Sequence, residues 1–443
     1  MTVIFGIFLL TLLLITAVAI VRARNLFVAV MLMGIASLLI AANFFLLDAA
    51  DVALTEAAVG AGISTVLFLG ALALTSERER FPTSRKMLSF VVVTLAALVV
   101  IYATFDKPPF GAADAPVQVH VAPWYLETTR TQVDIPNVVT AVLGSFRGYD
   151  TLGEVFVVFT AGIGVLFLLA GGRSDKKRTA PIQSNIGLRQ HLIPRVVGRL
   201  LIPFILLFGL YVQFHGEYGP GGGFQAGAII AAAIVLFALL EGEERALLVI
   251  PRRVLLGLMA GGAVVYGAVG VVGMLLGGNF LDYSVLADDP VKGQQLGSLL
   301  IEAGVGITVT GTLISIFPAF AARGRLSMNI LGIYFYWVFA ILLMVGFYAV
   351  IAKLNLIKKL IGLALFQSAV FLLYITMGKI EGGTAPIFGG TNEVFSNPLP
   401  QVLILTAIVV GISTTALGIG LVVRIKEEYD SIEENEIQEI DRR

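Results

Sequence analysis

The chain has 443 residues, of which 57% are hydrophobic and 14% are charged, and its mean hydropathy is +0.92. A soluble chain of this length is far less apolar, so the solvent around this one is mostly lipid. The formal net charge of zero excludes the basic surface of a nucleic-acid-binding protein. The absence of cysteine excludes disulfides, thiolate metal sites and thiol catalysis. We therefore expect no cofactor and no metal site in the chain.

Repeated apolar runs determine the expected fold. A helix needs about 20 predominantly apolar residues to cross a bilayer, whereas a β-barrel shows short alternating segments. We predict an all-α, polytopic transmembrane helix bundle of about 12 spans. The first run has no basic segment before it, which indicates an anchor rather than a cleaved signal. The runs cover residues 3–21, 26–47, 52–74, 88–105, 151–170, 199–213, 224–240, 254–276, 298–317, 330–351, 356–377 and 401–423.

Two segments lie outside the predicted spans. Residues 106–150 are rich in proline, which predicts one long extramembrane loop that ends in an interfacial helix. Residues 427–443 form an acidic tail, which we expect to be solvated or to form a short surface helix.

Lysine and arginine residues predict the orientation of the spans. The loops after spans one, three, five, seven and nine hold about 18 of these residues, against about four in the opposite loops, so the amino terminus is expected outside. The alternation then fails, because it places Lys353, Lys358 and Lys359 outside as well. Either one earlier run does not cross fully or the last third of the chain inverts.

Acidic residues inside apolar runs are candidates for ion transport, because a charged side chain costs at least about 2.5 kcal/mol at the centre of a bilayer. Asp51 and Glu56 open the third run, with Glu56 more than one turn deeper. We predict an ion path that includes both, with Glu56 the better placed. The alternative is structural, with Asp51 as the helix cap and Glu56 as a first-turn carboxylate that the helix dipole stabilises.

Two later runs contain further candidates for the ion path. Arg147, Asp150 and Glu154 lie at helical spacing and form either a charged ladder for protons or an ion-pair network at the headgroup level. Glu302 lies a few residues into the ninth run and is followed by threonines. It either lines a hydrated path or is one acid among small residues that pack helices together.

A glycine-rich link separates the sixth and seventh runs. Pro220, Gly221, Gly222 and Gly223 permit a tight turn and expose backbone amides at the start of the next helix. A phosphate-binding loop would follow a strand and carry a Lys-Ser or Lys-Thr pair, and neither is present. We predict a structural, re-entrant turn here.

Polar residues of the eleventh run are candidates for coupling between subunits. Lys358 and Lys359 stand at its start, and Gln367 lies within it. A lysine at a helix end otherwise extends its amine to the membrane surface, and a neutral polar residue otherwise holds helices together. The sequence shows no Ser/His/Asp set or metal-ligand cluster, so the chain is not expected to be an enzyme.

Several segments, in order, resemble one family. DVALTEAAVGAGISTVLFL and NVVTAVLGSFRGYDTLGE resemble the carboxy-terminal part of the A subunit of Mrp-type multisubunit Na+/H+ antiporters. HGEYGPGGGFQAGAIIAA and QLGSLLIEAGVGITVTG resemble the B subunit. NLIKKLIGLALFQSAVFLL and NPLPQVLILTAIVVGISTTAL resemble the C subunit, which is related to the three-helix K-type subunit of respiratory complex I. Membrane-bound hydrogenases have related subunits.

The resemblance implies fused modules. The ion path that it implies includes Asp51, Glu56 and Glu154. Two departures from the family pattern are Asn397, where an aspartate is usual, and Gln367, where the complex I relative has in-span glutamates, which favours a scaffolding role for the last module. The implied modules are a three-helix A-like part at 1–80, a two-helix A-like part with the long loop at 81–180, a four-helix B-like domain at 181–325, a three-helix C-like domain at 326–426 and the tail at 427–443.

The resemblance implies an accessory subunit of a multisubunit monovalent cation (Na+)/H+ antiporter in a bacterial or archaeal cytoplasmic (inner) membrane. The expected partners are large antiporter-like membrane subunits, other small Mrp-type subunits, the lipid bilayer, Na+ and H+, and no nucleic acid. The alternative function is that of a membrane-arm module in an ion-pumping redox complex such as a membrane-bound hydrogenase. A scaffold without an ion path is the third possibility.

Overall fold

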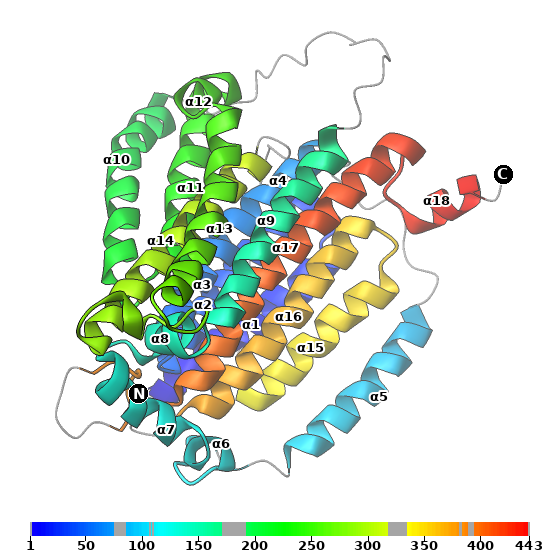
Figure 1. The fold of residues 1–443 in the computed structure, drawn as a ribbon. Helices are drawn as coiled ribbons and strands as arrows, with labels where there is room; N and C mark the ends of the chain where they lie inside the picture. Colours follow the sequence, from blue (N-terminus) through cyan, green and yellow to red (C-terminus); the bar gives the residue numbers. More distant parts are fainter. Residues whose placement is uncertain are drawn as a thin grey trace. The chain divides into compact units, whose positions relative to one another are not determined.

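A computed structural model describes residues 2–74, 86–105, 108, 110–170, 192–317, 335–380, 383–388 and 394–441. Within these ranges the chain is helical, and its β-structure consists of four isolated bridges. The helices form two compact units (Figure 1). The first unit comprises Met1–Arg130, Pro136–Val139 and Ala322–Arg443, and the second comprises Thr131–Ile135 and Thr140–Ala321.

The first unit combines helices from both ends of the chain. These helices are α1 (Thr2–Arg22), α2 (Leu26–Leu46), α3 (Ala50–Glu56), the π-helix η1 (Ala57–Ser64), α4 (Thr65–Leu74), α5 (Lys86–Thr104), α15 (Phe335–Ala352), α16 (Leu356–Gly378), α17 (Pro398–Tyr429) and α18 (Glu434–Asp441). α15, α16 and α17 pack side by side, and α1, α2 and α3 contact α15, α16 and α17 respectively. The unit therefore depends on packing between segments that are distant in sequence.

Asparagine side chains begin three helices of the first unit. Asn25 accepts a hydrogen bond from the backbone N–H of Phe27 at the start of α2, and Asn355 accepts one from Lys358 at the start of α16. Asn397 caps α17 in the same way and is followed by Pro398, whose ring suits the first helical position. The asparagine that replaces the family's usual aspartate thus keeps the capping function.

The second unit contains the middle of the chain. Its helices include η3 (Val142–Phe146), α9 (Gly148–Ala170), α10 (Leu192–His215), α11 (Gly223–Glu241), α12 (Glu243–Val249), α13 (Arg252–Leu275), the 3-10 helix η5 (Ser284–Leu286) and α14 (Pro290–Ile316). α14 packs against α9, α11 and α13. Its approach to α13 is close at Gly304, where a β-carbon would lie 2.8 Å from the carbonyl oxygen of Gly262. Small residues therefore bring these helices together.

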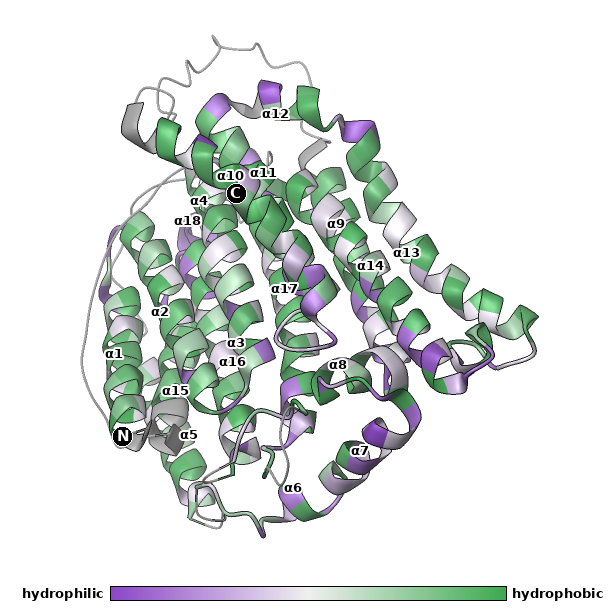
Figure 2. Ribbon diagram, turned by 90° about the vertical axis from the view of Figure 1, so that its left-hand side faces the viewer, coloured by the Kyte–Doolittle hydropathy of each residue, from purple (hydrophilic) through white to green (hydrophobic). Residues whose placement is uncertain are grey.

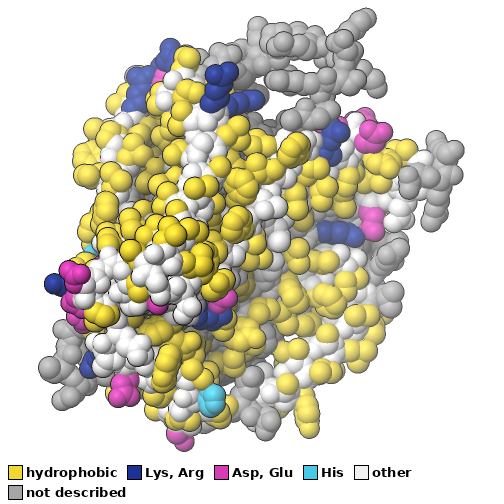
Figure 3. All heavy atoms as spheres, in the orientation of Figure 1, with side chains coloured by type: hydrophobic (Ala, Val, Ile, Leu, Met, Phe, Trp, Pro, Cys, Tyr) yellow, Lys and Arg dark blue, Asp and Glu magenta, His cyan; other side chains and the backbone are white. Residues whose placement is uncertain are grey.

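The predicted bundle of spans is confirmed. Ten helical segments in the described ranges are long and apolar enough to cross a membrane, and two shorter apolar helices, Ser89–Thr104 and Ile341–Ala352, fall on the fourth and tenth predicted runs. Hydrophobic residues run along these helices in Figure 2. Hydrophobic side chains also cover most of the helical surface in the face drawn in Figure 3, as expected of a surface that contacts lipid.

The long loop predicted at 106–150 contains short helices. They are α6 (Pro116–Val119), α7 (Ala122–Thr128), the π-helix η2 (Thr129–Val133), α8 (Val138–Ala141) and η3. The buried Gln118 amide donates to the carbonyl oxygen of Gly378 at the end of α16, at 3.1 Å. This bond holds the start of the loop against the first unit.

The acidic tail is partly buried. Ser431, Ile432 and Glu433 are buried, and the Asn355 amide donates to Glu433 at 2.8 Å. The tail then forms α18, which confirms the short helix but not full solvation of the segment. The three other boundaries between the predicted modules, at 80/81, 180/181 and 325/326, lie outside the described residues.

Candidate ion-path residues

Glu56 is the last residue of α3, where the third span changes from an α-helix to the π-helix η1. Only 4% of the residue is exposed, and its carboxyl group is hydrogen-bonded to the Ser37 hydroxyl on α2. The alternative of a first-turn carboxylate is wrong, because Glu56 lies at the opposite end of α3. A π-helical turn is uncommon and often marks a functional site.

Gly60 provides space for this pair. A β-carbon at Gly60 would lie 2.5 Å from the Ser37 Oγ and would also overlap with the Glu56 carboxyl group. Gly62 is different, because a β-carbon there would lie 3.8 Å from its nearest neighbour, the carbonyl oxygen of Ala57. One of the two glycines of η1 is therefore required by the carboxyl group.

Asp51 is buried, with 2% of the residue exposed. The Asn137 amide donates to both of its carboxylate oxygens, at 3.1 and 3.2 Å. The expectation that Asp51 caps its helix is wrong, because the cap position belongs to Ala49, which makes no side-chain bond there. Asp51 instead anchors the Asn137 segment to the first turn of α3.

A second carboxylate at this end of α3 was not predicted. Asp48 accepts hydrogen bonds from the Lys379 amine and, at 2.8 Å, from the Ser396 hydroxyl. Lys379 also donates to the carbonyl oxygen of Gly383 at 3.2 Å. The group joins the loop before α3 to the segment between α16 and α17. Lys379 follows an apolar run in sequence, but nothing in the sequence indicates its partner.

Lys358 is a buried cation in the first unit. Only 1% of the residue is exposed, so extension of its amine to the membrane surface is excluded. The amine donates to the carbonyl oxygens of Ile20 and Val21, each at 3.3 Å, and to that of Ala23. These carbonyls belong to the carboxyl end of α1, which carries partial negative charge. Lys358 therefore caps a helix that is distant in sequence.

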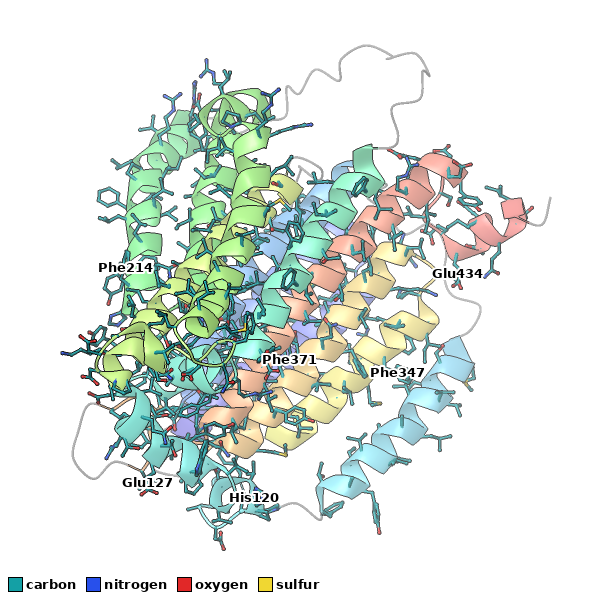
Figure 4. The ribbon with its side chains drawn as sticks, viewed as in Figure 1. His120, Glu127, Phe214, Phe347, Phe371 and Glu434 are labelled. Atoms are coloured by element: carbon teal, nitrogen blue, oxygen red, sulfur yellow. The ribbon has the colours of Figure 1, made fainter. Side chains whose placement is uncertain are left out.

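Lys359 and Gln367 have different surroundings. Lys359 forms an ion pair with Glu434 at 2.8 Å, near the start of α18, where Figure 4 labels Glu434. Gln367 lies on α16 opposite Gly411 of α17, where a β-carbon would lie 3.3 Å from its Oε1. Both residues thus join elements within the first unit.

Glu302 meets the glycine-rich turn in the second unit. Its carboxylate accepts a hydrogen bond from the backbone N–H of Gly223, the first residue of α11. Gly222 has a φ of 118°, which favours glycine, and a β-carbon there would lie 2.7 Å from the Glu302 Oε2. Two groups that were predicted separately, Glu302 and the turn at Pro220–Gly223, therefore form one site. A carboxylate at a helix amino terminus is stabilised by the helix dipole.

Glu154 is buried on α9 near two tyrosines that were not predicted. Tyr266 on α13 and Tyr283 before η5 are fully buried, and the Tyr266 hydroxyl donates to the carbonyl oxygen of Gly148 at 2.7 Å. Both Glu154 and Glu302 interact electrostatically with Tyr266. Burial raises the pKa of Tyr283, so its hydroxyl stays protonated. Asp150 lies apart from this group and pairs with Arg147.

Glu241, at the end of α11, is the centre of a charged cluster. Its carboxylate forms ion pairs with Arg195 at 3.1 Å, with Arg199, and with Arg245 at 2.7 Å. Arg199 and Arg245 are half exposed, whereas Glu241 is buried. The cluster joins α10, α11 and the start of α12, and the acidic residue after the apolar run is the only sequence sign of it.

These arrangements have a shared chemistry. Buried carboxyl groups next to hydroxyl and carbonyl oxygens can exchange a proton or hold a small monovalent cation, because oxygen atoms are the preferred ligands of hard cations. No group of three or more His, Cys, Asp or Glu side chains suited to a metal ion occurs in the described ranges. The fold and these side chains define a polytopic helical membrane protein with carboxyl groups buried in its spans.

Four family models match the chain in order. Two describe the D and E subunits of MBH and match residues 11–77 and 87–184 respectively. The third, "Domain related to MnhB subunit of Na+/H+ antiporter", matches 193–315, and the fourth, "NADH-ubiquinone/plastoquinone oxidoreductase chain 4L", matches 334–442. The chain belongs to the family of Mrp-type Na+/H+ antiporter subunits and their MBH relatives.

Individual relatives agree with this assignment. The chain is 27% identical over 330 residues to the probable A/B subunit of a K(+)/H(+) antiporter of Rhizobium meliloti, which covers 66% of the chain and 32% of that protein. It is 39% identical over 99 residues to the C1 subunit of a Na(+)/H(+) antiporter of Staphylococcus epidermidis, which covers 22% of the chain and 85% of that protein. The chain thus spans about a third of the length of the first relative.

One solved structure is similar in fold. A chain of the Mrp complex from Dietzia sp. DQ12-45-1b matches with a TM-score of 0.57 and 26% identity. The match covers 70% of this chain and 34% of that one. The similarity supports the helical membrane architecture.

Proposed function

We propose that the chain is an accessory membrane subunit of a multisubunit monovalent cation/H+ antiporter. It performs no covalent chemistry of its own, and it lies in the cytoplasmic membrane of a bacterium or archaeon beside large antiporter-like subunits. The observation that carries the proposal is the buried Glu56 carboxyl group, bonded to Ser37 where the third span becomes a π-helix.

The role of Glu56 follows from its surroundings. A carboxyl group in a bilayer is costly when charged and unpaired, so it binds either a proton or a cation. Ser37 offers it one hydrogen bond, and Gly60 leaves the carboxyl group space that a larger residue would fill. Glu56 can therefore alternate between a protonated and a cation-bound state. Glu154 and Glu302 serve in the same way in the second unit.

The proposal is tested with Glu56→Gln, which keeps the size of the side chain but cannot ionise. Membrane vesicles that contain the assembled complex are given a proton gradient, and its dissipation by added Na+ or K+ is measured. We expect the variant to lose exchange while the complex still assembles, because the amide neither binds nor releases a proton at ordinary pH.

A matched control replaces a carboxylate that water surrounds. Glu428 is exposed near the end of α17, so Glu428→Gln should leave the exchange rate unchanged. Full exchange by Glu56→Gln across the whole pH range would show that the ion path does not include this residue.

A second candidate function rests on the family models for the D and E subunits of MBH, which match 11–77 and 87–184. In this case the chain is a membrane-arm module that couples electron transfer in a partner to ion movement. The purified complex would then contain iron or nickel, whereas a stand-alone antiporter contains neither. Metal analysis of the complex separates the two functions.

A further inference from the structure

The second unit buries three hydroxyl groups near its two acidic spans. Tyr266, Tyr283 and Ser298 are each 0% exposed. A β-carbon at Gly148 would lie 3.1 Å from the Tyr283 Oη and 3.6 Å from the Tyr266 Oη. Both phenol groups therefore reach the same point at the start of α9.

Two of these hydroxyls are unsatisfied. The Tyr283 Oη and the Ser298 Oγ are buried and have no hydrogen-bond partner in the described part of the chain. A buried hydroxyl without a partner costs about 1–3 kcal/mol, and phenylalanine or alanine would avoid this cost. Unsatisfied polar atoms of this kind indicate a place for water.

The acidic side chains flank the hydroxyls. Glu154, on α9, and Glu302, one turn after Ser298 on α14, both interact electrostatically with Tyr266. The ring of Tyr283 packs against Gly297, the neighbour of Ser298, where any side chain would overlap with it. α9, α13 and α14 pack against one another, so the five polar groups form one buried cluster.

We propose that Tyr266, Tyr283 and Ser298 hold water that carries protons between Glu154 and Glu302. The proposal rests on the proposed function and adds the tyrosines and Ser298 to the ion path. A protonated carboxyl group gives its proton to the first oxygen of the chain. Each oxygen then gains one O–H bond and loses another, and the final carboxylate takes up the proton. The hydroxyls finish unchanged, so no tyrosinate accumulates.

The test uses Tyr283→Phe, which removes the hydroxyl that has no partner. If the hydroxyl serves only structure, its removal leaves exchange unchanged and keeps or raises thermal stability. We expect unchanged or raised thermal stability together with a loss of exchange of about tenfold, because proton transfer through a positioned group contributes at least that much. Exchange in vesicles and unfolding of the purified complex in detergent provide the two measurements.

A second variant and a control complete the test. Ser298→Ala should lower exchange per assembled complex in the same direction, and Tyr149→Phe, which changes an exposed tyrosine of α9, should not lower it. Full exchange by both Tyr283→Phe and Ser298→Ala, while Glu56→Gln is inactive, would overturn the relay alone. Full exchange by Glu56→Gln would instead count against the proposed function.

Discussion

Single residues distinguish the buried acids of this protein from one another. Asp51 is held by the two hydrogen bonds of an amide, and Asp48 is paired with a lysine. Glu56 has a hydroxyl for a neighbour and two glycines in the π-helix that follows it. A carboxyl group that exchanges ions must release them, so weak and neutral neighbours suit Glu56 better than Asp51 or Asp48.

The space at Gly60 provides the first prediction at this scale. Gly60→Ala should displace Ser37 or Glu56, because the new β-carbon would lie 2.5 Å from the Ser37 Oγ, and exchange should fall by about tenfold or more. Gly62→Ala is the matched control, since a β-carbon there has ordinary contacts. Equal exchange rates for the two variants in vesicles would show that the carboxyl group does not need this space.

Glu217 provides a prediction about pH. Burial raises its pKa above the ordinary value of 4.5, so the folded protein binds a proton here more readily than the unfolded chain does. The stability from this group is fully present below pH 4.5 and is lost as the pH rises through the folded-state pKa. Glu217→Gln should therefore lose less stability than the wild type between about pH 4.5 and pH 8.

Thermal unfolding of the purified protein at several pH values measures this difference. Glu428→Gln, at an exposed site, should reproduce the wild-type curve. A Glu217→Gln curve that runs parallel to that of the wild type would mean that the buried position does not perturb this carboxyl group.

The acidic candidates for the ion path could be found from the sequence, because an ionisable residue in an apolar run stands out and lipid makes it costly. Their partners could not. Asn137 lies far along the chain from Asp51, and Tyr266 and Tyr283 are ordinary residues in their own segments. Only packing between distant segments brings such groups together, and no local pattern records it.

At the scale of elements, the helices that cross the membrane follow directly from composition. Each needs only a long apolar run, since its backbone bonds are internal, and all twelve predicted runs coincide with helices. The π-helical turns of η1, η2 and η3 have no comparable signal, because they depend on the packing of their neighbours.

The end of α1 provides a prediction at the same scale. Lys358→Met keeps an apolar side chain of similar length but removes the donor to three backbone carbonyls. A buried carbonyl left unsatisfied costs about 1–3 kcal/mol, so we expect a loss of stability in that range. Lys359→Met removes only a partly exposed ion pair and should cost at most about 1 kcal/mol.

Reversible unfolding in mixed detergent micelles gives the two free energies. A smaller loss for Lys358→Met than for Lys359→Met would mean that the amine of Lys358 does not cap α1.

At the scale of the whole molecule, the order of the family segments along the chain does not determine how they pack. The first unit combines residues from both ends of the chain, and the second unit contains most of the middle. Hydrophobic patterns identify the spans but not their neighbours, because one apolar helix resembles another to a lipid. The family resemblance supplied the identity of the segments, and the described structure supplies their contacts.

The central claim is that this chain belongs to a cation/H+ antiporter, and its most direct test is transport by the complex purified through a tag on the chain. The complex is reconstituted into liposomes with a proton gradient, and Na+ or K+ is added. We predict that large antiporter-like subunits co-purify without iron or nickel and that the cation dissipates the gradient. A complex that contains iron–sulfur or nickel proteins and does not respond to either cation would contradict the claim.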